Sequence, residues 1–313
     1  AYMILATWGL AYGLARENTV ALEGWQTKSV VLNKNANLFM NSSILTKDDL
    51  KKIDDRPLFL YEDFCMQSIA VESINHIYGD GYNLTIGEGM TGNSLYLYGF
   101  GKSDFSMSPG KVAHLTVKSG TFERIIGYVR SRDRLNCDGY TSNITIEGTA
   151  YVKRIVAGSA SGEIQNANVN INVESGTVDE LIGGNQGYNI SPSPFSGTTS
   201  ISINGGTVTK LYGAGSGRNK SVPTYRGSLE VSVTGGTVAN LYGAGSAAYV
   251  ISDEAVTSEV AIAVSGGLVG NLFAAGKGWD EGSQLGSAPS ASTSEFVGGV
   301  DPNDFGSLTG NAS

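Results

Sequence analysis

The sequence is poor in charged residues, cysteine and histidine. Only 16% of its 313 residues are Asp, Glu, Lys or Arg, and it contains two cysteines and two histidines. The formal net charge of −8, with no basic cluster to offset it, excludes nucleic acid as an expected partner. Cys65 and Cys137 are too few to form a disulfide scaffold, and we expect both to be buried free thiols.

Long hydrophobic runs and helical patterns are also scarce. No apolar run reaches the roughly 18 residues of a membrane span, so no span is expected. Residues Met3 to Ala15 are apolar but have no basic leader, which favours a capping helix over a retained signal peptide. Outside Ile4 to Arg16 the apolar residues show no helical period, which excludes helical and leucine-rich repeats.

Glycine is abundant, with 43 residues, and much of it lies in a repeated motif. The segment Gly205 to Ser216 returns almost unchanged at Gly235 to Ser246 and in worn form at Gly266 to Lys277. Weaker copies lie earlier in the chain. The second glycine of the motif falls at Gly120, Gly148, Gly176, Gly206, Gly236 and Gly267. A period of about 30 residues predicts stacked supersecondary units.

Each motif predicts a coil with three sides. A short alternating run such as Ile201-Ser-Ile203 predicts a strand with one buried face, and Thr-Val-x-x-Leu predicts a second strand. Gly-Ala-Gly-Ser then bends into a third side. We therefore expect an all-β, right-handed parallel β-helix (a solenoid) of about eight coils. Equivalent residues should stack into an interior column, which consists of Ile125, Ile155, Leu181, Leu211, Leu241 and Leu272.

The copy around Gly148 tests this register. It is one residue short before the glycine and one residue long after it, so the two changes cancel. A net slip of one residue would exchange the buried and exposed faces of the strands. We interpret the irregularity as a bulge that leaves both interior columns in phase.

Two domains are expected. Residues 1–55 do not match the repeat and are predicted to form a small N-terminal cap of a short helix and strands, which would protect the first strand edges. Residues 56–313 are predicted to form the parallel β-helix. The segment Ser307 to Ser313 looks like the start of another coil, so we expect the solenoid to continue beyond residue 313.

The coils carry a resemblance at the level of fold. The segment Tyr78 to Gly89 resembles the opening coil of pectate-lyase-like β-helix proteins. The Gly-Gly-Thr-Val-x-x-Leu-Tyr-Gly-Ala-Gly coils resemble bacterial surface and adhesin-like repeat proteins, over about residues 57–307. The resemblance implies the fold, but because this superfamily includes lyases, hydrolases, phage tailspikes and adhesins it does not select a function.

Aromatic residues are the candidate binding residues. Tyr212, Tyr242 and Phe273 occupy equivalent positions and should form a column, and amphipathic rings of this kind can stack on sugars. The alternative is a column that faces the core, because aliphatic residues precede it at the same position. The further candidates are tyrosines of the loops between coils, namely Tyr188, Tyr225 and Tyr249.

Two outward columns are interpreted as structural. One column holds charged and amide side chains that predict a ladder of ion pairs and hydrogen bonds, namely Arg124, Arg154, Glu180, Lys210, Asn240 and Asn271. Asp179 and Glu180 should point apart, since they are adjacent on a strand. The other column is too irregular for an ice-binding face and holds Thr116, Thr145, Asn172, Ser202, Ser232 and Ala263.

No catalytic or metal constellation is expected. His76 and His114 have neither a nucleophile motif nor metal-like partners nearby. The candidate carboxylates share no column and are Asp133, Asp138, Glu180, Asp253 and Glu254. Structural calcium is the one cofactor considered, through Asp280, Glu281, Asp301 and Asp304, but solvated turn acids are favoured. We expect no catalytic residue, no metal site and no cofactor.

These observations favour a non-catalytic scaffold or adhesin, extracellular or on a cell surface. Its recognition loops would be residues 185–197, 218–227, 247–258 and 278–306, and its partners would be glycans or surface proteins. One alternative is a polysaccharide-active enzyme or phage tailspike of the same fold. Another is a self-assembling filament or sheath subunit that associates through its solenoid ends.

Overall fold

The structure is a computed structural model and describes most of the predicted solenoid. The described residues are 58–59, 63–66, 76–88, 95–101, 111–130, 134–187, 193–217, 221–252, 257–277, 308–309 and 311–312. Residues 1–55, which are expected to form the cap, lie outside the described residues. The sequence-based interpretation of the cap therefore stays a prediction.

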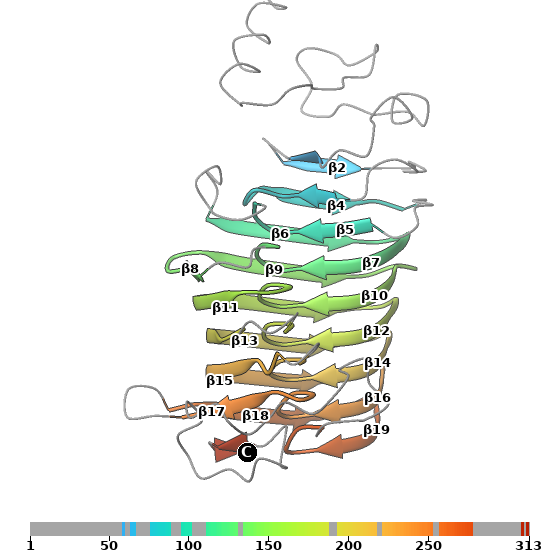
Figure 1. Cartoon of the computed structure of the whole chain (residues 1–313). Coiled ribbons are helices and arrows are strands. Elements are labelled where there is room, and N and C mark those ends of the chain that lie inside the picture. Colours follow the sequence, from blue (N-terminus) through green and yellow to red (C-terminus); the bar gives the residue numbers. More distant parts are fainter. Residues whose placement is uncertain are drawn as a thin grey trace, which may run out of the picture.

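The described residues form strands and turns, without a helix, and the strands stack into two parallel sheets (Figure 1). The nine-stranded sheet A contains, in spatial order, β1 (Leu58–Phe59), β3 (His76–Tyr78), β5 (Leu95–Tyr98), β7 (Thr121–Ile126), β10 (Tyr151–Val156), β12 (Thr177–Ile182), β14 (Thr207–Tyr212), β16 (Thr237–Tyr242) and β19 (Leu268–Phe273). Each strand pairs with its equivalent in the next coil, as β12 does with β14.

The twelve-stranded sheet B provides the other long side of the solenoid. Its main path is β2 (Phe64–Met66), β4 (Asn83–Ile86), β6 (Val112–Val117), β9 (Thr141–Ile146), β11 (Glu163–Val173), β13 (Phe195–Ile203), β15 (Thr224–Val233), β17 (Tyr249–Ile251) and β20 (Leu308–Thr309). Three strands join beside this path, namely β8 (Arg134–Asn136), β18 (Glu259–Val264) and β21 (Asn311–Ala312).

This parallel β-solenoid confirms the predicted fold class. The number of coils differs slightly from the roughly eight expected from the repeat. The first strands, β1 to β5, contain only two to four residues, so the N-terminal coils are less regular than the later ones. The last described strands, β20 and β21, pair in parallel with β17 and β18, as a further coil would.

The interior column has the predicted register. Leu181 lies between Ile155 and Leu211 in neighbouring strands, and all three side chains are fully buried. Leu272 is in the same column but is 49% exposed, because β19 pairs with β16 alone among the described strands. Ile144, which precedes Gly148, pairs with Ile171, and Ile155, which follows Gly148, pairs with Leu181. The register of this coil is therefore the predicted one on both sides of the glycine.

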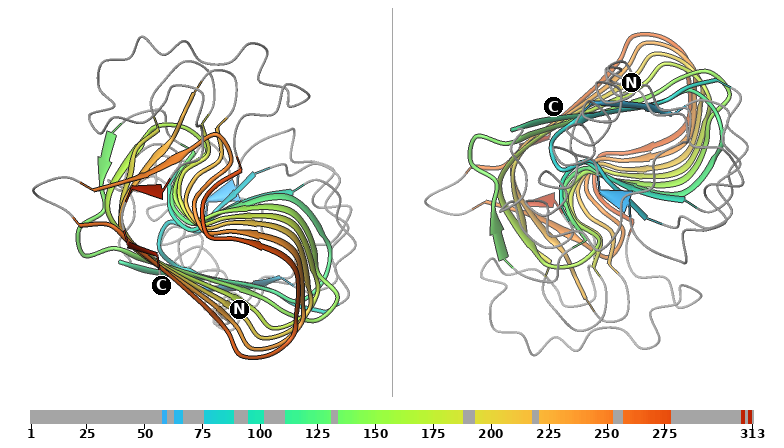
Figure 2. Two further views of the ribbon diagram at one scale, coloured as in Figure 1. Left: turned by 90° about the horizontal axis from the view of Figure 1, so that it is seen from below. Right: turned by 90° about the horizontal axis from the view of Figure 1, so that it is seen from above.

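A third side closes each coil. Single bridges link Gln186 to Ser216, Ser216 to Ser246 and Ser246 to Lys277. Sheet B also bends along its length, and the coils therefore have a bent outline in cross-section (Figure 2). The bend passes through Gly197, whose φ is +137° and whose added Cβ would lie 2.0 Å from the Ala167 carbonyl oxygen. Only glycine accepts both conditions at this corner.

Candidate functional site

The predicted aromatic column belongs mainly to a second apolar core. Tyr212 is 3% exposed and stacks on Tyr242 at 5.3 Å between ring centroids, and Tyr242 stacks on Phe273 at 4.8 Å. The column continues through Ile182, Val156 and Ile126 to two buried tyrosines, and this cluster is separate from the main core. Tyr212 therefore offers no free ring face to a sugar, whereas Phe273, in the last described coil, is 46% exposed.

The other predicted tyrosines are dispersed. Tyr225 lies in β15, is 1% exposed, stacks on Phe195 and donates a hydrogen bond of 2.7 Å to the Ser228 carbonyl oxygen. Tyr249 begins β17. Tyr188 lies outside the described residues. Of these three tyrosines, the structure describes the side chain of Tyr225 alone, and that ring lies in the core; the roles of Tyr188 and Tyr249 stay predictions.

The outward face of sheet B instead carries three adjacent columns of small, uncharged polar side chains. The columns pair in register from β6 to β15, and from β9 to β13 every member is small and uncharged, whereas β6 carries Val112 and His114 and β15 carries Glu230 in the same columns. We call this surface the polar face, and its residues are Thr116, Thr141, Asn143, Thr145, Asn168, Asn170, Asn172, Thr198, Ser200, Ser202, Ser228 and Ser232, all half-buried or exposed. One of the three columns was expected, but its two neighbours were not.

Side chains of the polar face hold one another in place. Asn170 Nδ2 donates to Asn143 Oδ1 at 2.9 Å, and Thr198 Oγ1 donates to Asn168 Oδ1 at 3.1 Å. Asn168 Nδ2 also donates to Thr141 Oγ1 at 3.3 Å. These bonds run along the solenoid from coil to coil, so they order the amide and hydroxyl groups while leaving other donors and acceptors for a ligand.

An open hollow of about 360 Å³ lies at the edge of the polar face, where sheet B bends. Its polar lining includes Asp138, Tyr140, Thr141, Asn166 and Asn168. Asn166 has a left-handed φ of +55°, which asparagine tolerates better than most residues. The bulge in register between Ile164 and Ala167 creates this corner.

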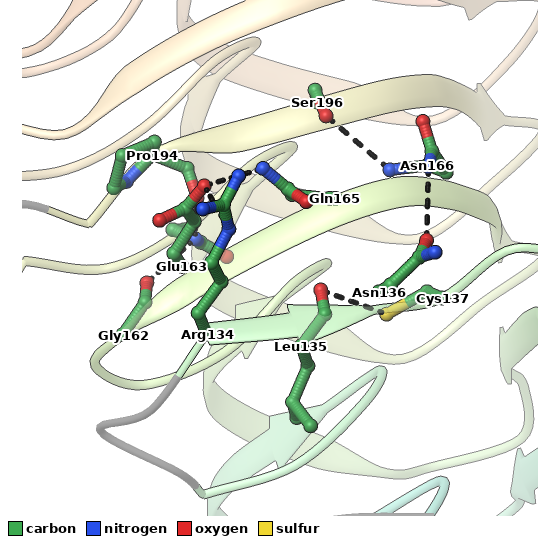
Figure 3. A network of polar contacts seen from close by, with 11 residues as sticks. Arg134, Leu135, Asn136, Cys137, Gly162, Glu163, Gln165, Asn166, Pro194 and Ser196 are labelled. Carbon is green, nitrogen blue, oxygen red and sulfur yellow. Dashed lines mark hydrogen bonds and ion pairs between the residues drawn. The ribbon is translucent and has the colours of Figure 1, made fainter.

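A network of hydrogen bonds and one ion pair stiffens this corner (Figure 3). Asn166 Nδ2 donates to Asn136 Oδ1 at 2.9 Å, and the Asn166 backbone N–H donates to Ser196 Oγ at 3.2 Å. Arg134 forms an ion pair with Glu163 at 3.1 Å. The hollow is therefore supported by side chains from three successive coils.

The two candidate carboxylates that the structure describes, Asp138 and Glu180, lie at different sheets. Asp138 lines the hollow beside sheet B, whereas Glu180 lies on sheet A in an ion pair with Arg154. Asp133, Asp253, Glu254, Asp280, Glu281, Asp301 and Asp304 lie outside the described residues. Among the described residues, no group of three His, Cys, Asp or Glu side chains could hold a metal ion.

The outward column of sheet A is partly a ladder. Asn271 Nδ2 donates to Asn240 Oδ1 at 3.0 Å, which extends the Arg154–Glu180 pair by a hydrogen bond farther along the column. Lys210 is in register with Glu180 but forms no ion pair with a described residue. Sequence reasoning also missed that His76 and Tyr96 begin this column, because their short strands lie outside the clear repeats.

The predicted orientation of Asp179 and Glu180 needs correction. Val178 and Leu181 are both fully buried, so Asp179 and Glu180 between them both lie outside the core and do not point apart. The Asp179 carboxylate accepts a hydrogen bond from the Tyr151 hydroxyl.

The cysteines also differ from the expectation. Cys137 is a buried free thiol, as expected, but Cys65 is exposed. Cys65 pairs in register with Thr85, which precedes Thr116 of the polar face in the same outward column. Its side chain therefore points away from the core.

Comparisons with known proteins give no relative. No family model matches the chain, and neither a curated protein nor a solved structure is similar to it. Within the part of the chain that the structure describes, no helix is long and apolar enough to cross a membrane. The geometry of the polar face and its hollow is therefore the basis for a functional proposal.

Proposed function

We propose that this protein is a non-catalytic extracellular scaffold or adhesin whose polar face binds a neutral glycan. The observation that carries the proposal is the set of three in-register columns on sheet B, which hold only uncharged amide and hydroxyl side chains from β9 to β13. Neighbouring coils repeat these groups about every 4.8 Å, and neighbouring columns lie about 7 Å apart. Amides and hydroxyls both donate and accept hydrogen bonds, as sugar hydroxyls do.

The order within the polar face supports binding. Because Asn168 is already hydrogen-bonded to Thr141 and Thr198, its amide loses little freedom when a ligand binds. The hollow adds Tyr140, a half-buried ring that also packs edge-on against Phe100 at 5.5 Å. An extended sugar chain across the columns, with one residue in the hollow, would use both features.

Binding of neutral oligosaccharides to the whole chain, first on a glycan array and then by calorimetry, tests this function. Asn168→Ala and Thr198→Ala should each weaken binding by about tenfold, which corresponds to 1.4 kcal/mol. Asn204→Ala is the matched control, because Asn204 is an exposed, hydrogen-bonded asparagine outside the polar face. Saturable cleavage of the bound glycan, or equal binding by all three variants, would contradict the proposal.

Self-association is a second candidate function, and it rests on the edge of β19. Leu268, Leu272 and Phe273 are 63%, 49% and 46% exposed on this strand, which pairs only with β16 among the described strands. Such an edge can pair with a strand of another copy. Sedimentation of the whole chain over a range of concentrations tests this, and Leu268→Lys should abolish any dimer. A strict monomer at high concentration would exclude it.

A further inference from the structure

One carboxylate stands without a counter-charge in the hollow at the edge of the polar face. Of the residues that line the hollow, Asp138 alone is charged, and its side chain is exposed. The other acid of this corner, Glu163, is paired with Arg134. Within the part of the chain that the structure describes, the Asp138 carboxylate forms neither an ion pair nor a hydrogen bond. A ligand in the hollow would therefore find this group free to accept.

The backbone holds Asp138 in a fixed place. Its N–H donates to Asn136 Oδ1 at 3.2 Å, and the Tyr140 N–H closes the turn by donating to the Cys137 carbonyl oxygen at 2.9 Å. The Tyr128 hydroxyl then donates to the Tyr140 carbonyl oxygen at 2.8 Å. A side chain on a turn that is anchored in this way loses little freedom when a ligand binds.

The polar groups around Asp138 make the lining rich in acceptors. Asn166 uses Nδ2 in its bond to Asn136, which leaves its Oδ1 as an acceptor. Thr141 Oγ1 accepts from Asn168 Nδ2 at 3.3 Å, so the hydroxyl proton of Thr141 remains to donate. The hollow thus offers a carboxylate and an amide oxygen as acceptors, beside a hydroxyl donor.

This lining favours a neutral ligand with adjacent hydroxyl groups. Two neighbouring hydroxyls of a sugar ring can donate to both oxygens of one carboxylate, and such hydrogen bonds are short and charge-assisted. An acidic sugar would instead be repelled by Asp138. A cationic amine is disfavoured by Lys111, since its Nζ lies only 3.8 Å from the place of a Cβ added to Gly139, next to Asp138.

We propose that Asp138 is a specificity-determining residue, which binds the vicinal diol of a neutral hexose in the hollow. The inference rests on the proposed function, because the hollow belongs to the same surface, and it adds the chemical group that is selected. The hexose donates from two adjacent hydroxyls to Asp138, and Thr141 and Asn166 contact its remaining polar groups. A sugar chain on the polar face is thereby fixed at one end.

An NMR titration of the whole chain tests the proposal with methyl glucoside, methyl galactoside and methyl mannoside, which together present cis and trans vicinal diols. At least one should shift the backbone amide signals of Gly139 and Thr141. Its 2,3,4-tri-O-methyl derivative should bind at least about tenfold more weakly, since it cannot donate. No shift at these amides, equal binding of the methylated sugar, or tighter binding of glucosamine hydrochloride would overturn the proposal.

Variants assign the binding to Asp138. Asp138→Asn keeps the shape of the side chain but removes its charge and one acceptor, so it should weaken hexoside binding by at least about tenfold. Glu88→Gln is the matched control, because Glu88 is an exposed acid in the turn after β4 and should not matter. Unchanged hexoside binding by Asp138→Asn would overturn the assignment.

The same variants separate this inference from the proposed function. If neutral oligosaccharides bind and Asn168→Ala weakens that binding while Asp138→Asn does not, the proposed function stands and the role of Asp138 is wrong. If no neutral oligosaccharide binds to the unaltered chain, the proposed function fails and the inference fails with it.

Discussion

Asn185 accepts a hydrogen bond from the backbone N–H of Ser159, in the preceding coil, through its side-chain Oδ1 at 2.8 Å. Its Nδ2 donates to the carbonyl oxygens of Gly162 and Pro194 at 3.0 and 2.7 Å, and the side chain is fully buried. One amide therefore holds together two turns of the backbone.

Replacing Asn185 should destabilise the protein strongly. Asn185→Ala leaves several buried backbone groups without partners, at a cost of about 1–3 kcal/mol for each group. Chemical unfolding followed by circular dichroism should show a clearly lower midpoint. The control is Asn204→Ala, where the lost hydrogen bonds are exposed to water and the midpoint should hardly change. Equal effects of the two variants would contradict this account.

The interior column should show a position-dependent cost of truncation. Leu181→Ala removes a fully buried side chain between two neighbours and should lower the free energy of unfolding by about 2–5 kcal/mol. Leu272→Ala makes the same change in the same column, but its side chain is 49% exposed, so we expect less than about half of that loss. Unfolding by urea measures both, and a larger loss at Leu272 would disprove the prediction.

Glycine should be required at position 236, in the turn before the second strand, for two separate reasons. Gly236 has a φ of +69°, and an added Cβ would lie 2.5 Å from the Gly205 carbonyl carbon of the previous coil. Gly139 has a similar φ of +76°, but its nearest neighbour would be 3.8 Å away. Gly139→Ala should therefore cost only the left-handed strain of about 1–2 kcal/mol.

Gly236→Ala should add an overpacking cost of about 1–3 kcal/mol to that strain. Thermal unfolding of the two variants separates the contributions. If both glycine variants melted at the same temperature, the close approach between coils at Gly236 would add no cost to the free energy of unfolding.

The two thiols should differ in reactivity. Cys65 is exposed and Cys137 is buried, so a thiol reagent should label one cysteine in the native protein and both after denaturation. Mass spectrometry of the labelled peptides identifies the site. The variant Cys65→Ser should remove all fast labelling, and rapid labelling of Cys137 in that variant would show that its coil opens readily.

Stability should fall at alkaline pH. Burial raises the pKa of the Cys137 thiol from 9.0 to about 12 and that of the Tyr212 phenol from 10.0 to about 12. The folded state favours the protonated forms, so their contribution is present below the unfolded pKa values and is lost between about pH 9 and 12. Each group reduces the free energy of unfolding by up to about 1.4 kcal/mol per pH unit in its range.

A variant assigns the onset of this loss. Urea unfolding at pH 8, 9 and 10 should show a decline between about pH 9 and 10 that Cys137→Ala reduces. Cys65→Ala serves as the control and should leave the decline as it is, because this thiol is exposed. A decline that Cys137→Ala does not change would show that the thiol is not its source.

Repetition explains which parts of the fold were predictable. Leu181 could be placed in the core because the same position is apolar in every copy, and one consistent register satisfies all of them. The coil around Gly148 was predictable for the same reason, since its two length changes cancel. The stacking of the coils is thus encoded by agreement among copies rather than by any single segment.

Features outside the clear repeat were not predictable. The bend of sheet B depends on the left-handed backbone of Asn166. The sequence around Asn166 does not distinguish it from the asparagines nearby, so the bend could not be predicted. The outward orientation of Cys65 depends on its pairing with Thr85 from a strand of only three residues. The contact between Arg130 and His76 joins residues 54 positions apart, and nothing in the sequence around either residue predicts it.

The parallel stacking of the coils has a consequence for how the polar face can change over generations. Duplication or loss of one whole repeat, about 30 residues, would lengthen or shorten the rod by about 4.8 Å without altering the alignment of the remaining columns. Gain or loss of such units by recombination in the gene would therefore change the length of the solenoid, while the surface chemistry of each coil stays the same.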